Sequence, residues 1–259
     1  MKRNTLKIIL FLILSVCSFS INYDEYLRKE LTDFGVRKNS IDTFFQGKKA
    51  LEEMAPINEI EALFFKAIEL DKRNYMAYQY LGTEALIHDR DKNKSIEYYK
   101  KSLKINPKNF EIYLNMGYIY EKEGNYEMAF KEYEKLKKIV PNSPESYYAA
   151  ASLNFKLGKF SNMLNDAQKA LKLYESPSYN LDMKEKYIMD AQFLILVSFF
   201  EQEKYEEALN YFFIVGPNMK KNNFDSFPKL LNVATEVINT KLESKNKKIY
   251  EEKLKKIKR

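Results

Sequence analysis

The sequence contains few of the residues that enzymes and metal proteins use most for chemistry. It has one cysteine, one histidine (His88) and no tryptophan among its 259 residues. So small a set of histidine and cysteine does not supply the ligands of a usual metal site or the members of a histidine-based catalytic group. The seven glycines are too scattered to form a loop that holds phosphate. We therefore expect no enzymatic activity, no metal and no cofactor.

Glycine and proline are also scarce, with seven of each in the whole chain. This scarcity argues against a protein rich in turns and β-strands, and it favours long helices. A hydrophobic share of 45% and a charged share of 31% are ordinary for a folded protein and argue against disorder. The composition therefore predicts a folded, helical chain.

The first twenty residues have the layout of a secretory signal peptide. A basic start, MKRNTLK, precedes an apolar run at residues 8–16, and small residues stand before a possible cut after Ser20. The apolar run is far shorter than the roughly 20 residues that a membrane-spanning helix needs, so an N-terminal membrane anchor is the weaker alternative. The prediction is an exported protein, periplasmic or associated with the envelope.

Cys17 stands where the lipidated cysteine of a bacterial lipoprotein would stand, three residues after Leu14. Lipoprotein signals usually carry a small residue directly before that cysteine, and here the residue is Val16. The match is partial, so two alternatives stay open. Cys17 carries a lipid anchor, or the cut after Ser20 removes it and leaves no cysteine for a disulfide or a thiolate site.

Basic charge is concentrated at the C-terminal end of the chain. The formal net charge is +7, of which the first twenty residues carry +3 and the last nineteen carry +6, so the body between them carries −2. A near-neutral body argues against nucleic acid as a partner. In the tail, Tyr250, Leu254 and Ile257 share one helical face. The tail either makes weak contact with anionic lipid at a membrane surface or is a solvated or disordered end.

A pattern of residues recurs every 34 or 35 positions in the middle of the chain. Tyr78 and Tyr113 are 35 residues apart, as are Gly82 and Gly117, and Tyr147 follows Tyr113 after 34 residues. Self-similarity at this period is typical of a solenoid, in which each repeat packs only on its neighbours.

The most regular repeat contains the stretch GNYEMAFKEYEKLKKIVP, residues 124–141. Ala129, Tyr133 and Leu136 fall on one helical face, and Pro141 ends the helix because it has no N–H to donate. Four residues upstream complete the pattern: Tyr113, Met116, Gly117 and Tyr120. With these residues the sequence resembles the tetratricopeptide repeat family.

The resemblance implies an all-α fold, an α-solenoid of antiparallel helix pairs in a right-handed superhelix with terminal capping helices. Small residues would let the two helices of a pair approach each other, and large residues would fill the gaps around the crossing, with Tyr133 and Leu136 facing the following pair. The residues assigned to this packing are Gly82, Gly117, Ala129, Tyr133, Pro141 and Ala208.

On this interpretation the signal at residues 1–20 is followed by three parts. Residues 21–39 form an N-terminal capping segment with a short helix closed by Gly35, residues 40–217 form an array of about five units, and residues 218–259 form a C-terminal capping helix and the basic tail. The units are residues 40–74, 75–109, 110–143, 144–177 and 189–217. About eleven residues are inserted around 176–186, with no role that the sequence assigns.

Tetratricopeptide arrays bind other proteins, so the resemblance implies a protein partner. The first helix of each unit lines a concave groove that takes an extended peptide or a helix. The positions that would project into it are uncharged: Gln79, Thr83, Leu114, Asn115, Tyr118, Tyr148, Ser152, Phe193 and Val197. An equal alternative is that Phe193 and Val197 pack within their own layer.

This groove lacks the cations with which some members of the family clamp the C-terminal carboxylate of a peptide. Asn115 alone matches such a position, and without Lys or Arg a carboxylate gains no charge-assisted hydrogen bonds. We therefore expect an apolar segment of another envelope protein as the ligand.

Three functions stay open. The first is a scaffold of the bacterial envelope that binds its partner near Tyr118 and Tyr148. The second, favoured by Cys17, is a membrane-anchored lipoprotein that helps to assemble outer-membrane proteins. The third is a hydrolase of cell-wall material, which has only the export signal behind it.

Overall fold

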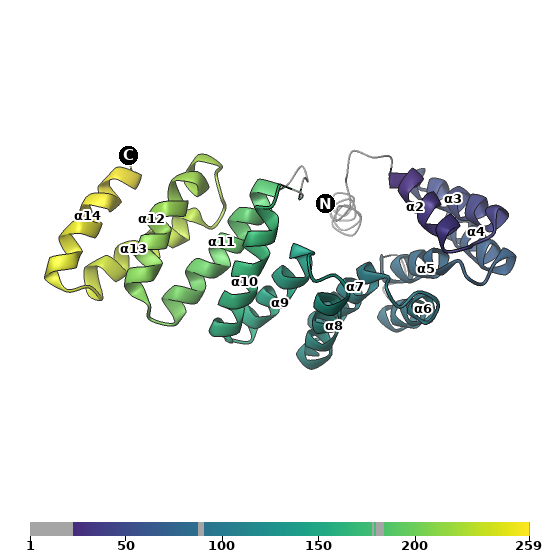
Figure 1. The fold of residues 1–259 in the computed structure, drawn as a ribbon, viewed down its shortest axis with the longest axis horizontal. Coiled ribbons are helices and arrows are strands. Elements are labelled where there is room, and N and C mark those ends of the chain that lie inside the picture. Colours follow the sequence, from purple (N-terminus) through teal and green to yellow (C-terminus); the bar gives the residue numbers. More distant parts are fainter. Residues whose placement is uncertain (1–22, 88–90, 178, 180–183, 259) are drawn as a thin grey trace. The chain divides into compact units, whose positions relative to one another are not determined.

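The computed structural model describes residues 23–87, 91–177, 179 and 184–258 (Figure 1). The described residues form thirteen helices and no strand, so the prediction of an all-α fold is confirmed. No helix within these ranges is long and apolar enough to cross a membrane. The signal peptide, its cleavage after Ser20, Cys17 and His88 all lie outside the described residues.

The chain forms two compact units, Met1–Ile139 (unit 1) and Val140–Arg259 (unit 2). In unit 1 the described helices are α2 (Tyr23–Asp33), α3 (Lys38–Glu52), α4 (Ile57–Leu70), α5 (Tyr75–Ile87), α6 (Lys92–Ile105), α7 (Phe110–Lys122) and α8 (Tyr126–Ile139). Helices α3 and α4, α5 and α6, and α7 and α8 make the most extensive contacts and form three helix pairs.

Unit 2 contains α9 (Pro144–Lys156), α10 (Phe160–Tyr174), α11 (Lys184–Glu201), α12 (Tyr205–Lys221), α13 (Phe227–Thr240) and α14 (Ser244–Lys258). Helices α9, α10, α11 and α12 each pack on the next, and α12, α13 and α14 pack on one another. Ser143 stands at the N-cap of α9 with Pro144 in the first turn, as expected from the sequence, but its side chain accepts no hydrogen bond from the helix.

The helix pairs of unit 1 share one close contact, in which a glycine of the first helix meets an aromatic ring of the second. The three contacts are Gly47 on Phe64, Gly82 on Tyr99 and Gly117 on Tyr133. The approach is closest at Gly117, where an added Cβ would lie 2.2 Å from Cε1 of Tyr133. Only glycine fits there without displacing a ring that is itself buried. The ring of Tyr133 covers the first helix of its own pair, a contact that the sequence interpretation did not assign to it.

Helix α2, the first of the described helices, covers the end of the α3–α4 pair. Leu27 and Leu31 are buried, and the guanidinium of Arg28 lies 4.0 Å from the ring centroid of Phe45. Gly35 ends α2 with a φ of +85°, a conformation that favours glycine. The helix closed by Gly35 thus forms where the sequence placed it.

The C-terminal end differs from the sequence interpretation in two ways. Pro217, placed at the end of the last unit, lies inside α12, which continues to Lys221. The described part of the basic tail also forms a helix, α14, which buries Tyr250, Leu254 and Ile257 in the core of unit 2 and leaves most of its lysines exposed. The apolar face that a lipid contact would need is therefore turned into the protein.

Candidate functional site

Gln79, the first residue assigned to the groove, is buried and hydrogen-bonded within unit 1. Its side chain is buried, and its amide N donates to Oε2 of Glu111 at 2.6 Å. Its amide oxygen accepts a hydrogen bond from Nδ2 of Asn109 at 2.7 Å. Both ends of the amide are thus used to join α5 to the start of α7, so Gln79 does not present a free amide to a partner.

Thr83 and Asn115 converge on the hydroxyl of Tyr99. Oγ1 of Thr83 lies 3.1 Å from this hydroxyl, and Nδ2 of Asn115 donates to it at 3.4 Å. Tyr99 is fully buried, and burial raises the pKa of its phenol. These two groove positions therefore satisfy a buried polar atom of their own unit.

Among the predicted groove positions of unit 1, Tyr118 on α7 is the exposed one, and Leu114 lies one turn before it. Leu114 is half-buried, and Tyr118 is 50% exposed. The ammonium of Lys122 lies 5.2 Å from the centroid of the Tyr118 ring, within the range of a cation–π contact. The result is a surface with an apolar centre and an aromatic ring that is open to solvent.

The groove positions of unit 2 mostly pack against neighbouring helices. The Phe193 ring lies 6.0 Å from that of Phe224, and Val197 packs against the buried cluster around Met163. Tyr148 packs against the same cluster, and burial raises the pKa of its phenol. Phe193 and Val197 thus contact residues of neighbouring units, Met163 and Phe224 among them, and are themselves partly buried. Ser152 is partly exposed.

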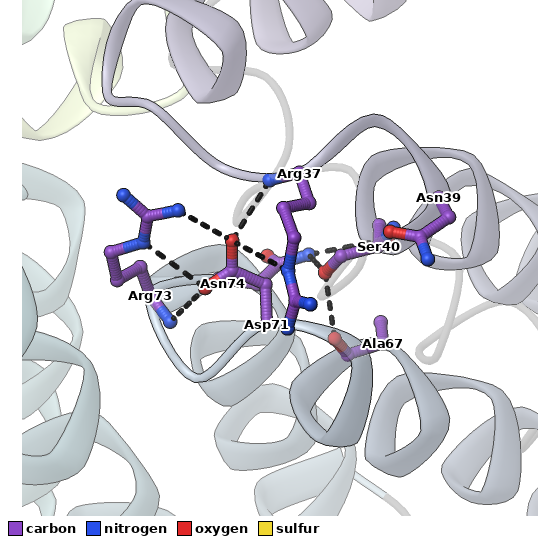
Figure 2. Close-up of polar contacts among 7 residues, drawn as sticks. All are labelled: Arg37, Asn39, Ser40, Ala67, Asp71, Arg73 and Asn74. Carbon is purple, nitrogen blue, oxygen red and sulfur yellow. Dashed lines mark hydrogen bonds and ion pairs between the residues drawn. The ribbon is translucent and has the colours of Figure 1, made fainter.

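A polar cluster that the sequence analysis missed lies where α4 ends and α3 begins (Figure 2). Asp71 is buried and accepts a hydrogen bond from the backbone N–H of Arg37 at 2.8 Å. It also accepts from the backbone N–H of Arg73 at 3.0 Å and from its guanidinium at 2.9 and 3.1 Å. The Arg73 guanidinium and these backbone donors hold the pKa of Asp71 well below its usual range.

Ser40 and Asn74 continue this cluster (Figure 2). Oγ of Ser40 donates to the carbonyl oxygen of Ala67 at 2.6 Å, and Nδ2 of Asn74 donates to Oγ of Ser40 at 3.0 Å. The amide oxygen of Asn74 accepts from the backbone N–H of Ala77 at 3.1 Å. These bonds join the loops and helix ends of unit 1, so the cluster fixes the connections between helices.

The sequence did contain a signal for this cluster, in the 35-residue period itself. Asn106 follows Asp71 by 35 residues, and its side-chain oxygen accepts from the backbone N–H of Lys108 at 3.1 Å. The same turn thus recurs with Asn in place of Asp. Within the described residues, no group of three or more His, Cys, Asp or Glu side chains is placed to hold a metal ion.

Comparison with protein families gives two matches, both to models described as tetratricopeptide repeat. One covers residues 98–131, and the other covers residues 77–109 and 144–177. These segments include the α9–α10 pair, nearly all of the α5–α6 pair and most of the α7–α8 pair.

Two curated proteins share part of the sequence. A TPR repeat-containing protein of Methanocaldococcus jannaschii is 30% identical over 112 residues, which is 43% of this chain and 19% of that protein. A UDP-N-acetylglucosamine–peptide N-acetylglucosaminyltransferase of Giardia intestinalis is 26% identical over 125 residues, 48% of this chain and 8% of that protein. The chain therefore spans less than a fifth of the length of either relative.

Solved structures share the fold at low sequence identity. The MamA protein matches with a TM-score of 0.53 and 15% identity, over 79% of this chain and 96% of that one. Pseudomonas aeruginosa PilF matches with a TM-score of 0.52 and 14% identity, over 86% of this chain and 98% of that one. These structures share the fold of repeated helix pairs with this chain, and residues 77–131 and 144–177 match the tetratricopeptide repeat.

Proposed function

We propose that this chain is a non-enzymatic scaffold for protein–protein interactions in the bacterial envelope, and that it binds an apolar segment of an envelope protein at the α7 surface around Tyr118. The observation that carries the proposal is the exposed ring of Tyr118 on the first helix of a tetratricopeptide pair. Export rests on the basic start and apolar run of residues 1–20.

The position of Tyr118 suits a binding residue. The preceding residue, Gly117, is fixed against the buried ring of Tyr133, so the Tyr118 backbone belongs to a firmly packed helix. An exposed tyrosine on a rigid element gives a partner a large apolar area, and little conformational entropy is lost when the ring is covered. Leu114, one turn earlier, extends this area along α7.

A pull-down from an envelope extract tests the proposal with three forms of the full chain: the natural sequence, Tyr118→Glu and Tyr126→Glu. Tyr126 is the matched control, because it is a similarly exposed tyrosine on the second helix of the same pair. We expect a protein captured by the natural chain and by Tyr126→Glu to be lost with Tyr118→Glu. Equal capture by all three forms would contradict the proposal.

Cys17 supports a second candidate function, a lipid-anchored protein that assists the assembly of envelope or outer-membrane proteins. Its motivation is the cysteine three residues after Leu14, at the end of an apolar run. Metabolic labelling with palmitate separates the two candidates. A label that is lost in Cys17→Ala, with release of the protein from the membrane fraction, would support the anchored form. An unlabelled protein would remove it.

A further inference from the structure

A groove of about 650 Å³ lies between α12 and α14 in unit 2, with an apolar floor and a basic rim. Phe213, Ile214 and Pro217 of α12 contribute to the floor. The rim carries three ammonium groups, from Lys220, Lys253 and Lys256. None of the described residues that line the groove is acidic.

The walls of the groove are held in place by contacts between the two helices. Gly216 allows Ile257 to approach so closely that an added Cβ would lie 2.8 Å from Cδ1 of that residue. The rings of Phe213 and Tyr250 stack with centroids 6.1 Å apart. Nζ of Lys220 donates to the carbonyl oxygen of Ile257 at 2.8 Å. The groove is therefore formed by packing that exists before any ligand binds.

The groove combines an exposed apolar residue with charged groups that are all positive. Ile214 is 74% exposed, although isoleucine is among the residues most often buried. The ammonium of Lys253 lies 5.8 Å from the ring centroid of Phe213 and 5.1 Å from that of Tyr250. A ligand that covers Ile214 would meet positive charge at the edge of the apolar floor.

We propose that this groove binds an acidic segment of a partner protein, which seats a large apolar side chain on Ile214 and Phe213 and pairs its carboxylates with Lys253 and Lys256. This second docking surface belongs to other helices than Tyr118 and does not depend on the function proposed for α7. The complementary charge would speed association and make binding sensitive to salt.

The structure favours a protein segment over a lipid surface. The apolar face of α14, which a helix lying on a membrane would insert, is buried against α12 and α13.

Fluorescence anisotropy with the full chain tests this proposal. The probe is a labelled peptide of about twelve residues with glutamates beside leucine and phenylalanine, and its control replaces each glutamate with glutamine. The test variant is K253E with K256E. The matched variant is K248E with K255E, which reverses two exposed lysines of α14 that do not line the groove. Circular dichroism establishes that both variants remain helical.

We expect the acidic peptide to bind the natural chain and the matched variant alike, and to bind the test variant about tenfold more weakly. We also expect the glutamine peptide to bind weakly. Equal loss in both variants, or no binding of the acidic peptide to the natural chain, would overturn the proposal. Binding to phosphatidylglycerol vesicles but not to the peptide would overturn it in favour of a lipid surface.

Discussion

The α7–α8 pair of unit 1 and the α9–α10 pair of unit 2 solve the same packing problem with different residues. In α7–α8, Gly117 meets the ring of Tyr133. Ala151 and Ala167 follow these two residues by 34 positions, and both alanines are fully buried in one cluster. One pair thus combines the smallest side chain with a large ring, and the other combines two small side chains.

Both pairs are closely packed where their two helices cross, although the residues at the crossing differ. The other pairs of unit 1 follow the first solution, with Gly82 on Tyr99 and Gly47 on Phe64. Because interiors are packed as densely as organic crystals, each solution should tolerate a change of both residues better than a change of one. Substitutions of Tyr133 and Gly117, singly and together, test this expectation for the α7–α8 pair.

The largest effect is expected for Tyr133→Ala. The ring is buried, and its hydroxyl donates to Oε2 of Glu121 at 3.1 Å, so its removal leaves a cavity beside Gly117. We expect the free energy of unfolding to fall by about 3–5 kcal/mol, measured by urea denaturation. A loss below about 1 kcal/mol would show that the crossing does not depend on the ring.

Gly117→Ala should have the next largest effect, because the new Cβ would overlap the Tyr133 ring. We expect a loss of about 1–3 kcal/mol in the free energy of unfolding. In the Tyr133→Ala background the same change should be neutral or stabilising, because the ring is gone and alanine favours a helix over glycine by about 1 kcal/mol. Additive losses in the double-mutant cycle would contradict the account.

Asp71→Asn extends the comparison to the polar turn, since Asn106 occupies the position one repeat later. Asparagine keeps an acceptor for a backbone N–H but loses the ion pair with Arg73, so we expect stability at neutral pH to fall by about 1–2 kcal/mol. Urea denaturation of this variant beside the natural chain gives the difference.

The same variant has a pH signature. The folded-state pKa of Asp71 lies below its usual value of 3.8, so the stabilisation is present above about pH 4 and is lost as the pH falls toward the folded-state pKa. The acid dependence of the free energy of unfolding should therefore be weaker in Asp71→Asn. An unchanged dependence would mean that this carboxylate contributes nothing to it.

Tyr118→Glu should have the smallest effect on stability. The ring is 50% exposed and takes no part in the Gly117–Tyr133 contact beside it, so we expect a change within about 0.5 kcal/mol. A thermal melt followed by circular dichroism measures it. A large loss would place Tyr118 among the packing residues instead of the binding residues.

The fold was predictable from the sequence because the period and the small residues report packing directly. Gly82 and Gly117 stand 35 residues apart, and each lets an aromatic ring of the second helix pack on the first helix of its pair. Gly35 adopts a φ of +85° at the end of α2, which is why a glycine marks that end in the sequence. The spacing gave the helix faces of α7 and α8, but it did not indicate that the Tyr133 ring covers Gly117 of its own pair.

The site was less predictable, because polar partners distant in sequence decide what remains exposed. Gln79 and Thr83 stand at groove positions by register, yet each bonds to a residue outside its own helix. In the tail, the face of Tyr250, Leu254 and Ile257 was recognised, but its burial depends on contacts with α12 across about 40 residues, which no local pattern encodes.

The most direct test of the central claim is photo-crosslinking in the native host, with p-benzoylphenylalanine at position 118 or at position 126. Both positions carry exposed tyrosines of the same helix pair, so the probes differ in the surface that they report. The account predicts one discrete protein adduct from position 118 that is absent from position 126. The same adducts from both positions, or none from position 118, would contradict it.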